Sequence, residues 1–294
     1  MLERWMKRFA PRGHCRLALS RTTVTVRRVG ASRKVPALFV ERPLAQTSTP
    51  EMLAASIGAA LEESGGHGLP VHARFADELA RYFIVTPAEN SRRLQDLRAA
   101  AEVRLRRLYG DDPARWQIMA DWQAAEPFLA CAVSRDWAGA LQAGVAAARG
   151  CLVSAMPAFV AAWNRSCREL DPGTWLATRG ERAMTLGLIG AAPRARLTAV
   201  RTLALPEPVP SLGWLRQQVT RMALLDNLPA PAALLLHGPR CEPWLPGAAD
   251  FTEPGLTVRW AEPDEWDESA ERASAGGGPL AESATPLAWS GTAR

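Results

Sequence analysis

The strongest constraint on the fold of this chain is an order of strand and helix patterns that occurs twice. Alternating and β-branched residues predict strands, and apolar residues spaced three and four apart predict helices. Three strands, a helix and a fourth strand follow one another from Cys15 onward, and the same order returns from Thr174. Two copies of a βββαβ order predict an α/β fold with two lobes, each a mixed sheet with helices on its faces.

The two copies are defined by the following segments. The first copy comprises the strands Cys15–Leu19, Val24–Val29 and Val35–Glu41, the helix Met52–Glu63 and the strand Leu69–Phe75. The second copy comprises the strands Thr174–Thr178, Ala183–Ile189 and Ala195–Leu205, the helix Leu212–Leu225 and the strand Ala232–His237. We therefore expect the segments 15–75 and 174–237 to form two separate, related sheets.

The chain between the copies predicts a smaller βαββα unit, inserted in the first lobe. Its elements are the strand Arg81–Thr86, the helix Ser91–Tyr109, the strands Trp116–Trp122 and Phe128–Val133, and the helix Asp136–Arg149. A strand Cys151–Ala155 and a helix Pro157–Leu170 then complete the first lobe, and Leu256–Trp260 is the counterpart of that strand in the second copy. Pro172-Gly173 is the candidate hinge between the lobes.

The charge of the chain, +5 overall, is divided between a basic beginning and an acidic end. Residues 1–42 hold 11 Arg and Lys against two Glu, a net charge of +9, and residues 261–294 hold seven acids against two Arg, a net charge of −5. The last segment is also rich in Gly and Pro, which predicts disorder. The expected organisation is a basic amphipathic segment (1–14), a first lobe (15–170, with the insertion at about 76–149), a second lobe (171–262) and an acidic, disordered tail (263–294).

The first residues predict a short amphipathic helix. Leu2, Trp5, Met6 and Phe9 fall at helical spacing, and Pro11 ends the pattern. Such a helix suits an anionic membrane surface or an acidic partner, or it packs on the core of its own protein. The residues expected to make the membrane or partner contact are Arg4, Trp5, Lys7, Arg8 and Phe9.

Several chemistries are disfavoured by what the sequence lacks. Its only lysines are Lys7 and Lys34, and the lysine-containing phosphate loop of P-loop proteins is absent. The four His and five Cys are scattered without metal-ligand spacing, so we expect no metal, no cofactor and no disulfide framework. No nucleic-acid motif accompanies the basic residues. No apolar run of about 18 residues and no signal peptide is present, which predicts a cytoplasmic protein.

Three stretches resemble the actin-like ATPase superfamily, and within it the pilus-assembly proteins of the PilM type and the cytoplasmic domains of the GspL type from type II secretion. They are the hairpin 17–26, the segment 80–86 with the charged helix after it, and the run 152–165. The resemblance covers roughly residues 15–260. It implies a two-lobed actin-like fold, a ribonuclease H-like duplication, with a small inserted α+β subdomain.

The resemblance also implies where nucleotide would bind. Active members carry Asp-x-Gly in the turn after the first strand of each lobe, where the carboxylate holds hydrated magnesium and the glycine lets the backbone wrap a phosphate. Here neither turn has that carboxylate, and a single glycine stands at the nucleoside loop, which implies that hydrolysis is lost. The expected cofactor is none, and ATP binding without hydrolysis is the alternative. The degenerate nucleotide-loop positions are Ser20, Arg21, Thr22, Thr178, Arg179, Gly180 and Gly238. Arg21 and Arg179 are expected to face the cleft, either as solvated turn residues or as groups that grip an anion.

The function implied by the resemblance is that of a non-catalytic scaffold. It would act at a type IV pilus or type II secretion-like platform, peripheral at the inner membrane, and bind a cytoplasmic segment of a single-span membrane protein in a groove beside the inserted unit. One alternative is an actin-like-fold ATPase or sugar kinase with atypical phosphate loops. The other is an unrelated two-lobe α/β binding module, because a fold does not determine a function.

Overall fold

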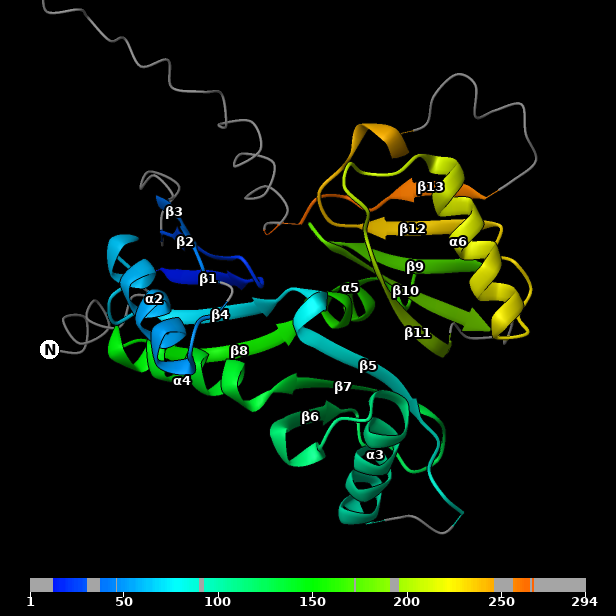
Figure 1. Ribbon diagram of the computed structural model, residues 1–294, viewed down its shortest axis with the longest axis horizontal. Helices are drawn as coiled ribbons and strands as arrows, with labels where there is room; N and C mark the ends of the chain where they lie inside the picture. Colours follow the sequence, from blue (N-terminus) through cyan, green and yellow to red (C-terminus); the bar gives the residue numbers. More distant parts are fainter. Residues whose placement is uncertain are drawn as a thin grey trace, which may run out of the picture.

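The computed structural model describes residues 13–30, 38–45, 47–89, 93–171, 173–190, 196–245, 256–264 and 266. These residues form three β-sheets with helices packed on them (Figure 1). The predicted helix within residues 1–12, Pro172 of the predicted hinge and residues 267–294 of the predicted tail lie outside the described residues. None of the described helices has the length and apolar character needed to cross a membrane.

The first sheet belongs to the first lobe and has the strand order β3-β2-β1-β4-β8. Its strands are β1 (His14–Leu19), β2 (Thr23–Val29), β3 (Leu38–Pro43), β4 (Pro70–Phe75) and β8 (Cys151–Pro157). The hairpin strands β1, β2 and β3 pair antiparallel, whereas β4 and β8 join parallel to β1. The side chains of Cys15, Leu17 and Leu19 are buried, as expected for alternate residues that face one side of a sheet.

The second sheet repeats this arrangement with the order β11-β10-β9-β12-β13. Its strands are β9 (Thr174–Arg179), β10 (Ala183–Gly190), β11 (Arg196–Ala204), β12 (Ala233–His237) and β13 (Thr257–Trp260). Three antiparallel strands again precede two parallel ones. The repeated βββαβ order therefore forms two separate sheets of one design, and the prediction of a two-lobed mixed α/β fold is confirmed.

Helices cover both sheets (Figure 1). The helices α2 (Pro50–Glu63) and α4 (Arg135–Ala147) lie side by side on one face of the first sheet, α6 (Leu212–Leu225) lies on the second, and α5 (Ala158–Ser166) lies between the lobes. Thr49 caps α2 by accepting a hydrogen bond from the Met52 amide. The two helices cross closely at Gly144, where an added Cβ would lie 2.7 Å from the Cβ of Ile57.

The inserted unit has a sheet and a core of its own. The strands β5 (Ala80–Val85), β7 (Phe128–Ser134) and β6 (Trp116–Ala120) pair antiparallel in that order, and α3 (Leu94–Tyr109) packs on them. Its core contains Phe83, Leu97, Leu105 and Phe128, all at most 2% exposed. Three short 3₁₀ helices, at Asp77–Leu79, Pro113–Arg115 and Glu242–Trp244, were not among the predicted elements.

Candidate functional site

The β1–β2 turn, where the resemblance implied the first phosphate loop, is closed by its own hydroxyl groups. The Oγ of Ser20 accepts hydrogen bonds from the amides of Thr22 (3.2 Å) and Thr23 (3.0 Å). It also lies 3.2 Å from the hydroxyl of Thr22 and 2.9 Å from that of Thr23. The amide groups that such a turn would offer to a phosphate are thus used within the turn itself.

Arg21 of the same turn is bound to the segment that follows β4. Its amide donates to a carboxylate oxygen of Glu78 at 2.8 Å, and its guanidinium Nη2 donates to the carbonyl of Glu78 at 3.5 Å. Glu78 thus brings a negative charge to the amide of Arg21, at the turn where the resemblance implied a phosphate loop.

Strand β9 ends with Thr178 and Arg179, Gly180 begins the turn to β10, and the guanidinium group of Arg179 is bound within the second lobe. Its Nη1 donates to the carbonyl of Pro239 at 2.8 Å, and its guanidinium carbon lies 5.9 Å from the ring centre of Trp244. The Gly180 amide closes the hairpin on the Ala183 carbonyl at 2.8 Å. Arg182, on the other side of this turn, lines two surface cavities together with Arg21.

Gly238 meets the same turn from the end of β12. Its φ is +111°, and a Cβ at this position would lie 2.2 Å from the carbonyl oxygen of Arg179. Only glycine fits this backbone conformation and this contact without strain. The structure thus brings Gly238 against Arg179.

The residue missed by the sequence prediction is Asp77, in the short helix after β4. Its side chain is 4% exposed and accepts hydrogen bonds from the hydroxyl of Tyr82, the amide of Phe159 (2.8 Å) and the hydroxyl of Thr178. Burial raises the pKa of Asp77, and the hydrogen bonds from Thr178 and Tyr82 act in the opposite direction. Since Thr178 belongs to β9, this carboxylate joins the two lobes.

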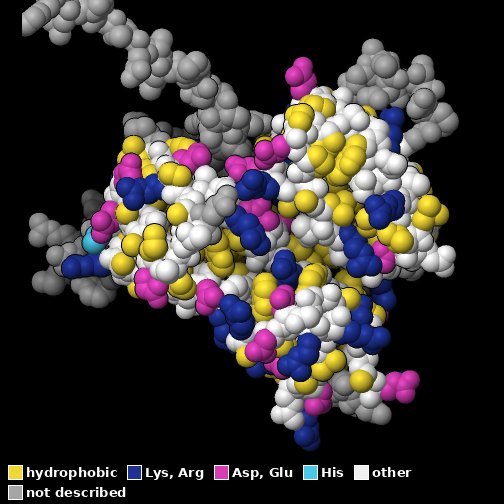
Figure 2. Space-filling model, in the orientation of Figure 1, with side chains coloured by type: hydrophobic (Ala, Val, Ile, Leu, Met, Phe, Trp, Pro, Cys, Tyr) yellow, Lys and Arg dark blue, Asp and Glu magenta, His cyan; other side chains and the backbone are white. Residues whose placement is uncertain are grey.

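A second contact between the lobes involves His237 at the end of β12. Its Nε2 lies 2.9 Å from the hydroxyl oxygen of Ser166 in α5. Burial, and secondly the charge of Arg165, lower the pKa of His237 to about 4, so the ring is neutral at pH 7. Figure 2 shows basic and acidic side chains close together along the junction of the lobes.

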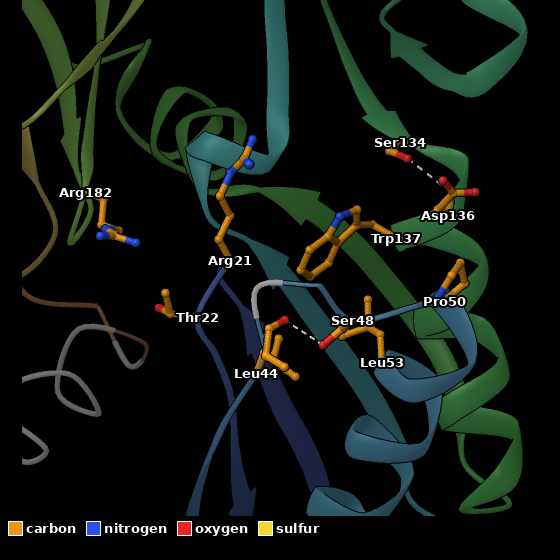
Figure 3. Close-up of a pocket in the computed structure, with 11 residues that line it drawn as sticks. Arg21, Thr22, Leu44, Ser48, Pro50, Leu53, Ser134, Asp136, Trp137 and Arg182 are labelled. Carbon is orange, nitrogen blue, oxygen red and sulfur yellow. Dashed lines mark hydrogen bonds between the residues drawn. The ribbon is translucent and has the colours of Figure 1, made fainter.

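A groove of about 430 Å³ lies beside the inserted unit (Figure 3). Its apolar floor is formed by Leu44 and Leu53, both buried, and the ring of Trp137 points into it from the start of α4. Arg21 and Arg182 line the groove from the two lobes, and Asp136 lines it beside Trp137. An apolar floor with charged groups at its edge is suited to bind an extended peptide through one apolar anchor.

A second hollow of about 580 Å³ lies on the other side of Arg21, between the inserted unit and the edge strand β11. Tyr109 lines it and donates a hydrogen bond to the carbonyl of Tyr82 at 2.7 Å. Arg81 lies 5.2 Å from the ring centre of Tyr109 and 3.5 Å from a carboxylate oxygen of Asp111. Among the described residues no group of three His, Cys, Asp or Glu side chains could hold a metal ion.

The predicted membrane-contact residues Arg4, Trp5, Lys7, Arg8 and Phe9 lie outside the described residues, so their role stays a prediction. The segment 76–78 links the predicted loop positions of the two lobes, because Glu78 binds Arg21 and Asp77 binds Thr178. The linked positions are Ser20, Arg21 and Thr22 in the first lobe and Thr178, Arg179, Gly180 and Gly238 in the second. The local feature that could have indicated Asp77 is its place two residues after the buried strand β4.

Comparison with known proteins supports the fold through structure alone. No family model and no curated protein matches the sequence. The cytoplasmic domain of EpsL, an inner membrane component of the type II secretion system of Vibrio cholerae, matches with a TM-score of 0.53 at 12% identity, over 91% of this chain and 96% of that one. The PilM-PilN type IV pilus biogenesis complex matches with a TM-score of 0.55 at 16% identity, over 86% and 89%.

A Bacteroides thetaiotaomicron protein with an actin-like ATPase fold and unknown function matches in the same range. Its TM-score is 0.53 at 9% identity, over 85% of this chain and 91% of that one. Sequence identities this low carry information on the fold and none on the activity. Together with the two sheets of identical strand order, the three similarities show that this chain has the two-lobed actin-like fold.

Proposed function

We propose that the protein is a non-catalytic, cytoplasmic scaffold of a type IV pilus or type II secretion-like assembly platform. It binds a cytoplasmic segment of a single-span inner-membrane protein. The observation that carries this proposal is the state of the two hairpin turns. In both, the backbone and side-chain groups that would serve a nucleotide are already bonded within the protein, and Ser20 and Ala177 stand where a metal-binding carboxylate would be required.

The similarity to EpsL and to the PilM-PilN complex supports the choice of machine. Both are components of assemblies, one of them described at the inner membrane, and each covers most of this chain. The groove beside the inserted unit supports the mode of binding, because Trp137, Leu44 and Leu53 offer an apolar anchor site to a peptide. Membrane attachment through residues 1–12 would add to this protein contact.

The experiment for catalysis measures phosphate release from ATP by the purified full chain with magnesium. We expect no turnover above that of a buffer blank, because two hard-cation ligands are missing. Magnesium-dependent turnover that is lost on Gly180→Ala would overturn the proposal in favour of an ATPase or sugar kinase with atypical loops.

The experiment for binding uses labelled peptides that reproduce the cytoplasmic segments of single-span membrane proteins encoded next to this one. Fluorescence anisotropy should show saturable binding that Trp137→Ala weakens at least tenfold, since a buried aromatic anchor contributes about 2 kcal/mol or more. Leu224→Ala, which shortens an exposed apolar side chain on α6, is the control and should bind as the unchanged protein does. Equal binding by both variants would place the partner elsewhere.

A further inference from the structure

The chain passes between the two lobes for a second time after β13. The first passage lies between α5 and β9. Beyond β13, the amide of Ala261 donates to the carbonyl of Leu236 in β12 at 2.9 Å, so the backbone leaves the second sheet from the end of its parallel strand pair. Arg165 of α5 then donates to the carbonyl of Glu262 at 3.1 Å, which brings the chain back to the first lobe (Figure 1).

The residues at this return also bind to a strand of the first sheet. We call residues 261–264 and Trp266 the strap. Arg74 of β4 donates to the carboxylate of Asp264 at 2.9 Å, and the Nη1 of Arg165 lies 3.9 Å from the same oxygen. One carboxylate of the strap is therefore paired with guanidinium groups from a strand and from a helix of the first lobe.

Trp266 completes the contact with the first lobe. Its ring centre lies 4.5 Å from the guanidinium carbon of Arg74, and its amide donates to Asp264 at 2.8 Å. The side chains of Arg74 and Asp264 are 18% and 21% exposed, so solvent screens their pair less than it screens a pair on the open surface. The predicted disordered tail begins at residue 263, but Asp264 and Trp266 pack against Arg74.

The strap lies beside the contact between His237 and Ser166, which also joins the lobes. Burial is the main reason why the pKa of His237 is lowered, and the charges of Arg165, Asp264 and Arg74 act on it as well. These three charged groups therefore lie near the imidazole ring. The strap, α5 and the end of β12 thus form one junction between the lobes.

We propose that the strap fixes the relative orientation of the two lobes, because it ties the end of the second lobe to β4 and α5 of the first. Two lobes joined by one passage of the chain move about that passage as a hinge unless further contacts restrain them. The strap adds such a restraint, and it sets the spacing between Arg21 and Arg182, which line the groove from opposite lobes. This inference is independent of the proposed scaffold function, since it concerns contacts within one molecule.

Arg74 carries most of this attachment, because it binds two groups of the strap at once. Its guanidinium group forms a charge-assisted hydrogen bond with the carboxylate of Asp264 and a cation–π contact with the ring of Trp266. A planar guanidinium group suits both contacts, whereas an amide side chain of similar reach has no charge for either. Arg74→Gln and Asp264→Asn should therefore release the strap without removing a large apolar side chain from the core.

Electron paramagnetic resonance measures the distance between spin labels on the two lobes of the full chain. Cys151 of β8 is exposed and takes one label, Leu224→Cys on α6 takes the other, and Cys167→Ser/Cys241→Ser removes the two half-buried thiols. We expect Arg74→Gln and Asp264→Asn each to raise the population of a longer distance about tenfold, which corresponds to about 1.4 kcal/mol. A minor state of about 1% would then reach about 10%. The double variant should show no larger population than the more open single one, because both changes break one contact.

Asp226→Asn is the matched control. Asp226 pairs with Arg201 at 2.7 Å within the second lobe, and its side chain is 17% exposed, close to the 21% of Asp264. Its loss should leave the distance distribution unchanged, and thermal melting verifies that each variant is folded.

The pKa of His237, measured by NMR on the four histidines of the chain, separates opening of the lobes from a local loss of charge. Asp264 raises this pKa, so a purely local effect of Asp264→Asn lowers it further. Opening exposes the ring and raises its pKa toward the ordinary value of about 6.5, which is the result we expect. The proposal is overturned if both variants keep the distance distribution of the unchanged chain, or if the pKa of His237 falls in Asp264→Asn.

Discussion

Breaking the hydrogen bond between Asp77 and Thr178 should destabilise the whole protein, because it joins the two lobes at a buried site. Asp77 is 4% exposed, and its carboxylate accepts hydrogen bonds from Thr178 of the second lobe and from Tyr82 and Phe159 of the first. Thr178→Val keeps the shape of the side chain and removes only the hydroxyl. Hydrogen bonds to charged groups contribute about 1.5–3 kcal/mol, so we expect Thr178→Val to lower the free energy of unfolding by about 2 kcal/mol.

Asp77→Asn should cost more, since it replaces an oxygen acceptor by an NH₂ group that faces donors. At least one buried donor then lacks an acceptor in addition to the lost charge, which predicts a loss of about 3–5 kcal/mol. Because both changes remove the same bond, the double variant should be less destabilised than the sum of the two. The expected coupling energy is at least about 1 kcal/mol.

Urea unfolding at pH 7 measures these values through tryptophan fluorescence and circular dichroism, with Thr198→Val as the matched control. The hydroxyl of Thr198 donates to the Leu188 carbonyl at 2.9 Å within the second sheet, so its loss leaves the Asp77–Thr178 bond in place. The reasoning is refuted if Thr178→Val costs less than about 0.5 kcal/mol, or if the two losses add without coupling.

Other predictions concern the cleft and the start of the chain. The pKa of His237 is lowered to about 4 in the folded protein, so between pH 6.5 and 4 the unfolded chain binds more protons than the folded one. The free energy of unfolding should therefore fall by up to about 3 kcal/mol as the pH drops through this window. His237→Gln should remove that part of the pH dependence in urea titrations. Gly238→Ala should destabilise the fold by about 2 kcal/mol or more in the same assay, because its φ of +111° and its contact with Arg179 exclude a side chain. Deletion of residues 1–12 should lower binding to vesicles of anionic lipid in a flotation assay, with a loss of binding free energy of about 1 kcal/mol for each basic residue near the surface. The melting temperature should stay unchanged, and a lower one would show that the segment belongs to the core.

The fold was accessible from the sequence because its elements have strong local signals. The helix Leu212–Leu225 was predicted with the bounds that the structure shows, since Ser211 caps it. The third strand was expected at Val35–Glu41, whereas β3 is described at Leu38–Pro43 and residues 31–37 lie outside the description. Pairing with β2 extends it to Pro43, and this register was not visible in the local pattern.

The site was less accessible, because its important contacts join residues that are far apart in the sequence. Ser20 and Gly238 could be singled out through the resemblance, because each follows a predicted strand at a position where the family has a nucleotide loop. The bond from Thr178 to Asp77 connects positions separated by a whole subdomain, and no local pattern predicts it. Arg179 and Arg182 lie three residues apart in the sequence, at the end of β9 and in the turn that follows it. Their different contacts come from residues that are distant in the sequence: Arg179 binds the Pro239 carbonyl, whereas Arg182 lines the groove.

The two acidic residues after β4 explain how the cleft is stable without a bound anion. Asp77 satisfies donors from both lobes, and Glu78 satisfies the amide of Arg21, so closing the cleft leaves these groups paired. A phosphate brought to the same amide would meet the carboxylate of Glu78, and two unit charges about 4 Å apart repel by about 4 kcal/mol at an effective dielectric constant of 20. Under the proposed function, the absence of a carboxylate at Ser20 and Ala177 and the presence of the internal carboxylate of Glu78 act in the same direction. Both disfavour nucleotide binding, and the scaffold would then hold its lobes in one arrangement through these internal interactions while the groove beside the inserted unit binds the proposed partner.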